Sequence, residues 1–338
     1  MALKLNQTDF NKALRNLSEH YWIVAPRRFA GRGRFSDTDL IQYGEINGAD
    51  EIVWDEKSTF SPKTVVFPIN QPMFYFKNDQ TIDPTASDDA KAILVFLRAC
   101  DIHGMERLDN LFLQNGLCPD HYYQQHRKKI HVVLMECAES FENCFCVSMG
   151  TNQTEQYSMA ARCEQDTVFI HIQDATFENY FQGLGASSTY APAFIEKNYT
   201  QVNLPDTQEM PAEMYSHPLW TEYKARCIAC GRCNTTCPTC SCFTTTDVAD
   251  PENPDSGERR RTWAGCHLDG FTNMAGGHEF RKDNASRMRF KTFHKIHDFK
   301  KRFGVHMCVG CGRCDDNCPE YISFRHCINK VTEALSKK

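Results

Sequence analysis

The sequence lacks an apolar run long enough to form a membrane helix. Its longest uninterrupted apolar stretches, residues 93–97 and 132–135, fall far short of the roughly 20 residues needed to cross a bilayer. The first ten residues also lack a positively charged segment followed by an apolar one, which a secretory signal requires. We therefore expect a soluble, cytoplasmic protein that meets no membrane.

The usual nucleotide and haem motifs are also missing. A glycine-rich phosphate loop would mark the common ways of binding NAD or ATP, but the segment Gly183-Leu-Gly185 lacks the third glycine and no Walker loop occurs. No C-x-x-C-H haem attachment site is present. Nothing favours a catalytic Cys–His pair either, so we expect no substrate chemistry on this chain.

Cysteine, in contrast, is abundant, with 18 among 338 residues. A reducing cytosol does not favour disulfides, and a chain of this length with 41% apolar residues can bury a core without them. Metal ligation is therefore the default explanation for so many thiols.

Two copies of one cysteine motif lie in the last third of the chain. Both have the spacing C-x2-C-x2-C-x3-C-P, which is typical of [4Fe–4S] ferredoxins. In two-cluster ferredoxins the fourth cysteine of each copy serves the other cluster. We therefore assign one cluster to Cys227, Cys230, Cys233 and Cys318, and the other to Cys308, Cys311, Cys314 and Cys237. A zinc site is the alternative, but it commonly uses two separated C-x2-C pairs.

The cysteine-rich part is basic although the whole chain has a net charge of −5. More than half of the Lys and Arg residues, but only about a third of the Asp and Glu residues, lie from Pro218 onward. Cations near clusters with thiolate ligands would offset their negative charge and tune their potentials, which is the simpler interpretation. Nucleic-acid binding is the other.

A long insertion, residues 243–303, separates the two motifs. It contains a basic and aromatic run from Arg281 to Phe303. This run is interpreted as a docking face for an acidic redox partner or as a solvated helix face, with a nucleic-acid patch as a third alternative.

Four cysteines upstream form a looser pattern: Cys100, Cys137, Cys144 and Cys146. Cys100 and Cys137 each follow a predicted strand, and the Cys144-Phe-Cys146 doublet would be unusual as pure packing. We expect a third [4Fe–4S] cluster here. The alternative is that these cysteines are small buried apolar residues.

The six remaining cysteines are interpreted differently. Cys240 and Cys242 closely follow Cys237 and either replace a ligand or pack beside the cluster, and packing is favoured. Cys266 is ambiguous in the same way. Ordinary free thiols are expected at Cys118, Cys163 and Cys327.

The apolar patterns predict two domains. Residues 1–215 are expected to form an α+β or α/β domain, with helices at 8–19 and 101–113 and strands at 64–67, 92–96, 130–135 and 167–172. A polar, proline-containing stretch at 200–217 is the predicted linker. Residues 216–338 are expected to form a mainly α-helical, two-cluster ferredoxin-like domain, whose last helix, at 322–335, packs against the second cluster.

Taken in order along the chain, several motifs resemble the β-subunit family of soluble hydrogenases and sulfur reductases, and within it the electron-transfer subunits of anaerobic sulfite reductases. The resemblance rests on the cysteine motifs, on Arg98-Ala-Cys100-Asp101, on Cys144-Phe-Cys146-Val-Ser148 and on Cys237-Pro-Thr-Cys240-Ser-Cys242. Hydrogenase relatives often have an extra cysteine shortly after the position of Cys137, which is absent here.

The resemblance implies a non-catalytic subunit in a hetero-oligomer. A flavin- and nicotinamide-binding subunit would take hydride from NADH, this chain would carry single electrons, and a sirohaem subunit would reduce sulfite to sulfide. A β-subunit of a soluble NiFe hydrogenase or sulfur reductase is the alternative in the same class. A nucleic-acid-binding protein with structural clusters is the alternative from another class.

Overall fold

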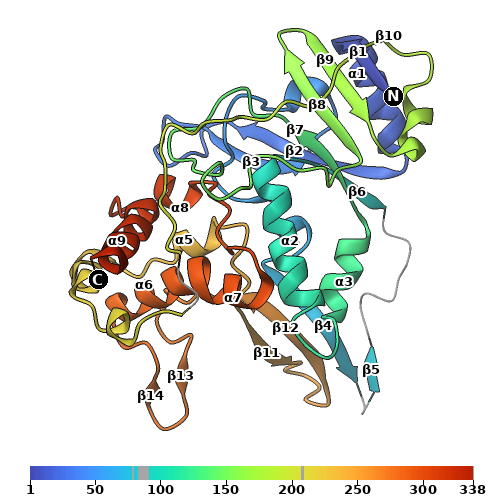
Figure 1. Cartoon of the computed structure of the whole chain (residues 1–338). Helices are drawn as coiled ribbons and strands as arrows, with labels where there is room; N and C mark the ends of the chain where they lie inside the picture. Colours follow the sequence, from blue (N-terminus) through green and yellow to red (C-terminus); the bar gives the residue numbers. More distant parts are fainter. Residues whose placement is uncertain (78–79, 83–90, 207–208, 338) are drawn as a thin grey trace.

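The computed structural model describes residues 1–77, 80–82, 91–206 and 209–337 (Figure 1). The helices are α1 (Gln7–Ser18), α2 (Ala99–Leu113), α3 (His121–Lys128), α4 (Thr221–Arg226), α5 (Arg232–Thr235), α6 (Asn284–Phe293), α7 (Phe299–Phe303), α8 (Arg313–Asp316) and α9 (Phe324–Ser336). The strands are β1 (Ala2–Asn6), β2 (Tyr21–Phe29), β3 (Leu40–Glu45), β4 (Asn70–Lys77), β5 (Gln80–Ile82), β6 (Ala92–Leu97), β7 (Ile130–Met135), β8 (Met159–Glu164), β9 (Thr167–Ile172), β10 (Ala186–Ser187), β11 (Phe243–Ala249), β12 (Ser256–Trp263), β13 (Asn273–Met274) and β14 (His278–Glu279).

An eight-stranded mixed sheet organises the first part of the chain, in the order β10-β1-β9-β8-β7-β6-β2-β3. Its centre is parallel, because β6 pairs in parallel with both β2 and β7, and β7 pairs in parallel with β8. The carboxyl ends of β6 and β7 therefore meet at one edge of the sheet, where the chain enters the segments that carry Cys100 and Cys137.

Helices cover both faces of this sheet (Figure 1). Helix α1 buries Phe10, Leu14 and Leu17 in the core on one face, and α2 contributes Ile102 and Leu108 to the core on the other. Alternate residues of β6 and β7 point into the two cores, so β6 is apolar throughout and β7 is apolar except at His131.

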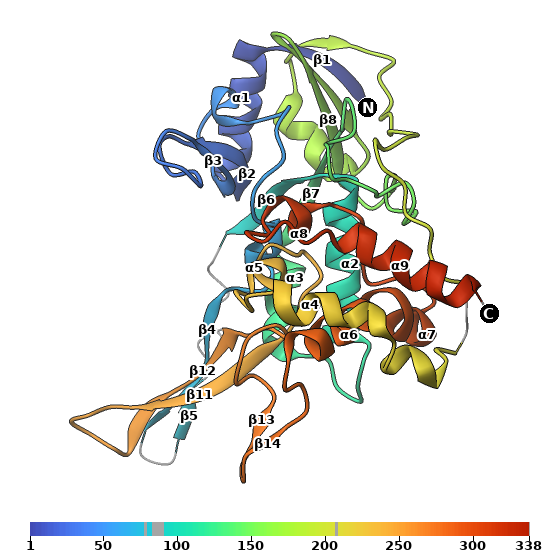
Figure 2. The same cartoon turned by 90° about the vertical axis from the view of Figure 1, so that its left-hand side faces the viewer.

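A second sheet, in the order β11-β12-β4-β5, joins distant parts of the sequence. Strands β11 and β12 belong to the insertion and form a hairpin that projects from the helices (Figure 2). Strand β12 pairs with β4, so the sheet crosses the boundary predicted near residue 215. The two-domain division and the mainly helical character of the second part therefore stay predictions.

Most predicted elements lie close to their expected residues. Helix α1 begins at Gln7 rather than Thr8 because the Asn6 side chain caps it, accepting a bond from the Asp9 amide at 2.8 Å. The strand prediction at 64–67 is wrong. Those residues follow Pro62 into a short 3-10 turn, Pro62–Val65, where the Phe67 amide donates to the Lys63 carbonyl. Proline favours the first position of a helical turn and cannot donate to a strand ladder.

Candidate metal centres

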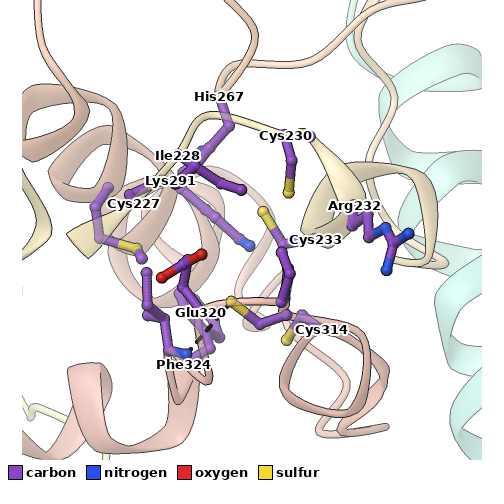
Figure 3. A pocket seen from close by; sticks show the side chains of 15 residues that line it. Cys227, Ile228, Cys230, Arg232, Cys233, His267, Lys291, Cys314, Glu320 and Phe324 are labelled. Atoms are coloured by element: carbon purple, nitrogen blue, oxygen red, sulfur yellow. Dashed lines mark hydrogen bonds between the residues drawn. The ribbon is translucent and has the colours of Figure 1, made fainter.

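The first group of four cysteines lines one cavity: Cys227, Cys230, Cys233 and Cys318. Cys227 and Cys230 lie before α5 and Cys233 is its second residue, and the side chains of these three point toward a common space in Figure 3. Gly231 allows the loop to turn, since it caps α5 with a left-handed φ of 72°. Cys318 comes from the second motif, so the cavity gathers the four residues of the predicted crossed set. We call them set 1.

The second group lines a neighbouring cavity: Cys237, Cys308, Cys311 and Cys314. Here Cys237 of the first motif joins three cysteines of the second, which is the reciprocal of set 1. Helix α9, beginning after its N-cap Ser323, packs Ile328 and Val331 into the core that borders Cys308, Cys314 and Cys318. We call this group set 2. Ligation of a cluster by either set remains a prediction.

The four upstream cysteines lie together at the carboxyl edge of the large sheet. Cys100 is the second residue of α2, Cys137 follows β7, and Cys144 and Cys146 lie on the next loop. Burial raises the pKa of the Cys146 thiol to about 12, and the neighbouring Cys144 and Cys137 contribute to the rise. The Cys100 pKa is raised by burial and by Asp101, and further by Cys146. We call this group set 3.

Sets 2 and 3 are in direct contact. Cys100, Cys146 and Cys311 belong to one buried group with Val309. Two glycines permit the close approach of the loops: a Cβ on Gly310 would lie 2.6 Å from the Cys146 nitrogen, and one on Gly312 would lie 2.3 Å from the Asn143 oxygen. The Phe145 amide also donates to the Gly310 carbonyl at 2.8 Å.

Nitrogen donors reach the sulfurs of set 3. The Arg98 guanidinium lies 3.4 Å from Cys137 Sγ, and Lys57 Nζ lies 3.7 Å from Cys144 Sγ. The Asn198 amide lies 3.5 Å from Cys146 Sγ. Such contacts stabilise thiolates, which are the form that binds metal.

Two buried lysines approach sets 1 and 2 from the insertion. Lys291 on α6 lines both cavities, and Figure 3 shows its side chain directed among the cysteines. Lys295, one helical turn later, lies 3.4 Å from Cys237 Sγ. Burial alone would lower both pKa values, but the surrounding thiolates raise them above the ordinary value.

The basic and aromatic run is therefore not a uniformly solvated face. Lys291 and Lys295 are each 3% exposed. Their i, i+4 spacing places them on one side of a helix, but no local pattern in the sequence shows that this side faces the cysteines. Residues directed at the cysteines are not free to contact nucleic acid.

Cys240, Cys242 and Cys266 lie beside the sets and do not line either cavity in the described part of the chain. The Asn234 amide lies 3.6 Å from Cys240 Sγ and 3.3 Å from Cys266 Sγ. The Cys240 carbonyl accepts a bond from Lys63, whose burial lowers its pKa to about 8. This arrangement favours packing beside the clusters for these three thiols.

Comparison with known proteins supports the iron–sulfur interpretation. Residues 226–322 match a family model described as a 4Fe-4S dicluster domain. The chain is also 27% identical to the sulfhydrogenase 2 subunit beta of Pyrococcus furiosus, over 98% of this chain and 99% of that protein. No solved structure matches. None of the helices in the described residues is long and apolar enough to span a membrane.

These findings show an iron–sulfur electron-transfer chain related to a sulfhydrogenase beta subunit. They favour the hydrogenase alternative over the sulfite-reductase interpretation, which they do not support. Both interpretations agree on the cysteine motifs, so the motifs alone could not distinguish them.

Proposed function

We propose that this chain is the electron-transfer subunit of a hydrogenase- or sulfur-reductase-type complex, and that sets 1, 2 and 3 each hold a [4Fe–4S] cluster. The observation that carries the proposal is the unbroken succession of the three cysteine sets. Each set offers four thiolates, and buried cations lie beside each, which is the donor chemistry that such clusters require. A cluster held there would take up and release one electron at a time.

Set 2 lies between the other two. Its cavity shares four lining residues with the cavity of set 1: Cys233, Lys291, Cys314 and Phe324. On its other side, the Cys311 carbonyl accepts a bond from Lys57 at 3.1 Å, and the Cys144 sulfur lies 3.4 Å from the same oxygen. The order 1–2–3 therefore gives a continuous path through the protein.

Side chains of this chain keep water away from the path and offset the negative charge of its thiolates. Phe145 and Phe324, both nearly inaccessible, line the set 2 cavity and keep water from it. Lys291, Lys295 and Arg98 place positive charge against thiolates that would otherwise repel one another. Cys230 is exposed, so set 1 reaches the surface at one end of the path.

The test is anaerobic purification with iron and acid-labile sulfide counted per chain. About 12 iron and 12 sulfide per chain support three [4Fe–4S] clusters. About 8 of each would show that set 3 holds no cluster. Zinc in place of iron would overturn the proposal.

A separate question is which partner subunits this chain binds in the complex. The resemblance to sulfite-reductase subunits implies flavin/nicotinamide and sirohaem partners, whereas the whole-length relative is named a sulfhydrogenase subunit. We favour the sulfhydrogenase-type complex. Isolation of the native complex decides between the two alternatives: a nickel-containing subunit supports the sulfhydrogenase type, and a sirohaem subunit contradicts it.

A further inference from the structure

A cleft of about 640 Å3 opens beside set 3, and the proposed function gives it no role. Its walls come from the β2–β3 loop, the segment 57–60, the loop before Cys144 and the two helices α5 and α8. The volume lies within the range of small-molecule and cofactor sites.

Three guanidinium groups line this cleft: Arg32, Arg34 and Arg232. Among the described residues, no carboxylate forms an ion pair with any of them. Arg232 lies between two hollows, because it lines the set 1 cavity (Figure 3) as well as this cleft. Guanidinium groups in a cleft are suited to phosphate, which they bind through paired charge-assisted hydrogen bonds.

Three carboxylates also line the cleft, but two are already paired. Asp39 accepts bonds from the Gly31 amide and from Arg28, and Asp316 pairs with Lys57 at 2.5 Å. Glu142 is the third. The cleft therefore presents an excess of positive charge.

Three phenyl rings share the cleft with these charges: Phe35, Phe60 and Phe141. Phe35 is 65% exposed and Phe60 is 37% exposed. Aromatic faces beside cations suit a flat ring that carries phosphate, because stacking holds the ring while the guanidinium groups hold the anion.

The cleft wall touches set 3 at two points. The Phe141 ring packs on Arg98, 4.7 Å from the guanidinium carbon, and Arg98 donates to Cys137 Sγ. Lys57 lines the cleft and also reaches Cys144 Sγ. A ring held against Phe141 would be one side chain from the cysteines of set 3.

We propose that this cleft binds a flavin nucleotide of the flavin mononucleotide class, with its phosphate on Arg32, Arg34 and Arg232 and its ring among the phenylalanines. The proposal rests on the proposed function for its redox role. A hydride donor of the reduced nicotinamide class, held by a partner subunit, would convert the oxidised flavin to its reduced anion. Reoxidation of that anion would release two electrons and one proton. The electrons would pass singly to the cluster of set 3, and the proton would go to solvent through the open cleft.

Binding is tested with the anaerobically purified, iron-loaded chain by the quenching of flavin fluorescence. Three probes separate the contributions: flavin mononucleotide has ring and phosphate, riboflavin has the ring alone, and ADP has phosphate without the flavin ring. We expect saturable binding of flavin mononucleotide, at least about tenfold tighter than riboflavin, since a charged hydrogen bond contributes about 1.5–3 kcal/mol. ADP, measured by competition, should also bind more weakly.

Two variants locate the site, Arg34→Gln and Arg32→Gln, with Arg15→Gln on the exposed surface of α1 as the control. Each cleft variant should weaken flavin mononucleotide binding by about tenfold and leave riboflavin binding unchanged, and the control should match the wild type. Absence of saturable binding, or equal affinities for all variants, would overturn the proposal. Iron content is measured on every sample, so loss of the clusters is recorded separately from loss of nucleotide binding.

Discussion

Arg313 and Asp101 form a two-pronged ion pair inside the protein, with nitrogen–oxygen distances of 2.6 and 2.9 Å. Their side chains are 1% and 0% exposed. Arg313 precedes Cys314 of set 2, and Asp101 follows Cys100 of set 3, so the pair joins the two sets. The Arg313 guanidinium also donates hydrogen bonds to the carbonyl oxygen and to the hydroxyl oxygen of Ser58, each at 3.0 Å.

Replacing Arg313 with methionine should destabilise the protein strongly. The substitution leaves the Asp101 carboxylate buried without its cation, and such a change typically costs about 3–5 kcal/mol. Anaerobic urea unfolding followed by circular dichroism measures the loss.

Arg232→Met is the matched control, because Arg232 occupies the same motif position in the first copy and is exposed. Its effect on stability should stay within about 0.5 kcal/mol. Equal losses for the two variants would contradict the importance of the buried pair.

Replacing Lys291 with glutamine should make the clusters of sets 1 and 2 harder to reduce. The substitution removes a buried positive charge beside both cavities. The negative charge that each electron adds to a cluster is then less well offset, so reduction becomes less favourable. At an effective dielectric constant of about 20, a unit charge about 7 Å away contributes about 2.4 kcal/mol, which corresponds to roughly 100 mV for one electron. Redox titration followed by electron paramagnetic resonance measures the potentials.

Lys301→Gln is the control for this prediction. Lys301 lies in the same basic run, but its side chain is 55% exposed and it pairs with Glu209. Its cluster potentials should equal those of the wild type, and Lys291→Arg should restore most of the shift. Unchanged potentials in Lys291→Gln with full iron content would show that this charge does not tune the clusters.

Replacing Cys137 with alanine should remove about 4 iron and 4 sulfide per chain and leave sets 1 and 2 loaded. Cys137 lies after β7, away from both ferredoxin-type cavities. The measurement is elemental analysis together with sulfide determination. Cys163→Ala, at a half-buried thiol on β8, is the control and should retain all iron. If both variants keep full iron, Cys137 is not needed to hold a cluster.

Alanine at Gly312 should separate the loops of sets 2 and 3. Its Cβ would lie 2.3 Å from the Asn143 carbonyl oxygen, and the backbone has a left-handed φ of 71°. We expect lower stability and reduced iron in set 3. Gly304 has a similar φ of 77° but open space around it. Gly304→Ala should therefore cost only the backbone strain of about 1–2 kcal/mol and retain its iron.

The sequence allowed part of this structure to be predicted because some signals are local. Strands β7 and β9 were expected at their observed residues, since continuous or alternating apolar runs between polar segments mark buried strands. The crossed grouping of sets 1 and 2 follows from the motif spacing together with the ligand pattern of two-cluster ferredoxins, and the structure brings those residues together.

Other features depend on partners that are remote in sequence. Arg232 and Arg313 occupy identical motif positions, yet one is exposed and the other is buried, because Asp101 lies beside only the second. Likewise, the spacing of Lys291 and Lys295 shows that they share a helix face but not that this face points at thiols. The cleft at set 3 combines five separate segments, which no local pattern reveals.

The crossed pairing of the motifs has a consequence for biosynthesis. Set 1 requires Cys318, set 2 requires Cys314, and the loop of set 3 rests on Gly310 and Gly312. None of these residues exists until the ribosome has made most of the chain, by which time the N-terminal strands are able to fold. Iron and sulfide would therefore be inserted after translation, and a chain truncated before residue 308 would have no complete site for sets 1 and 2.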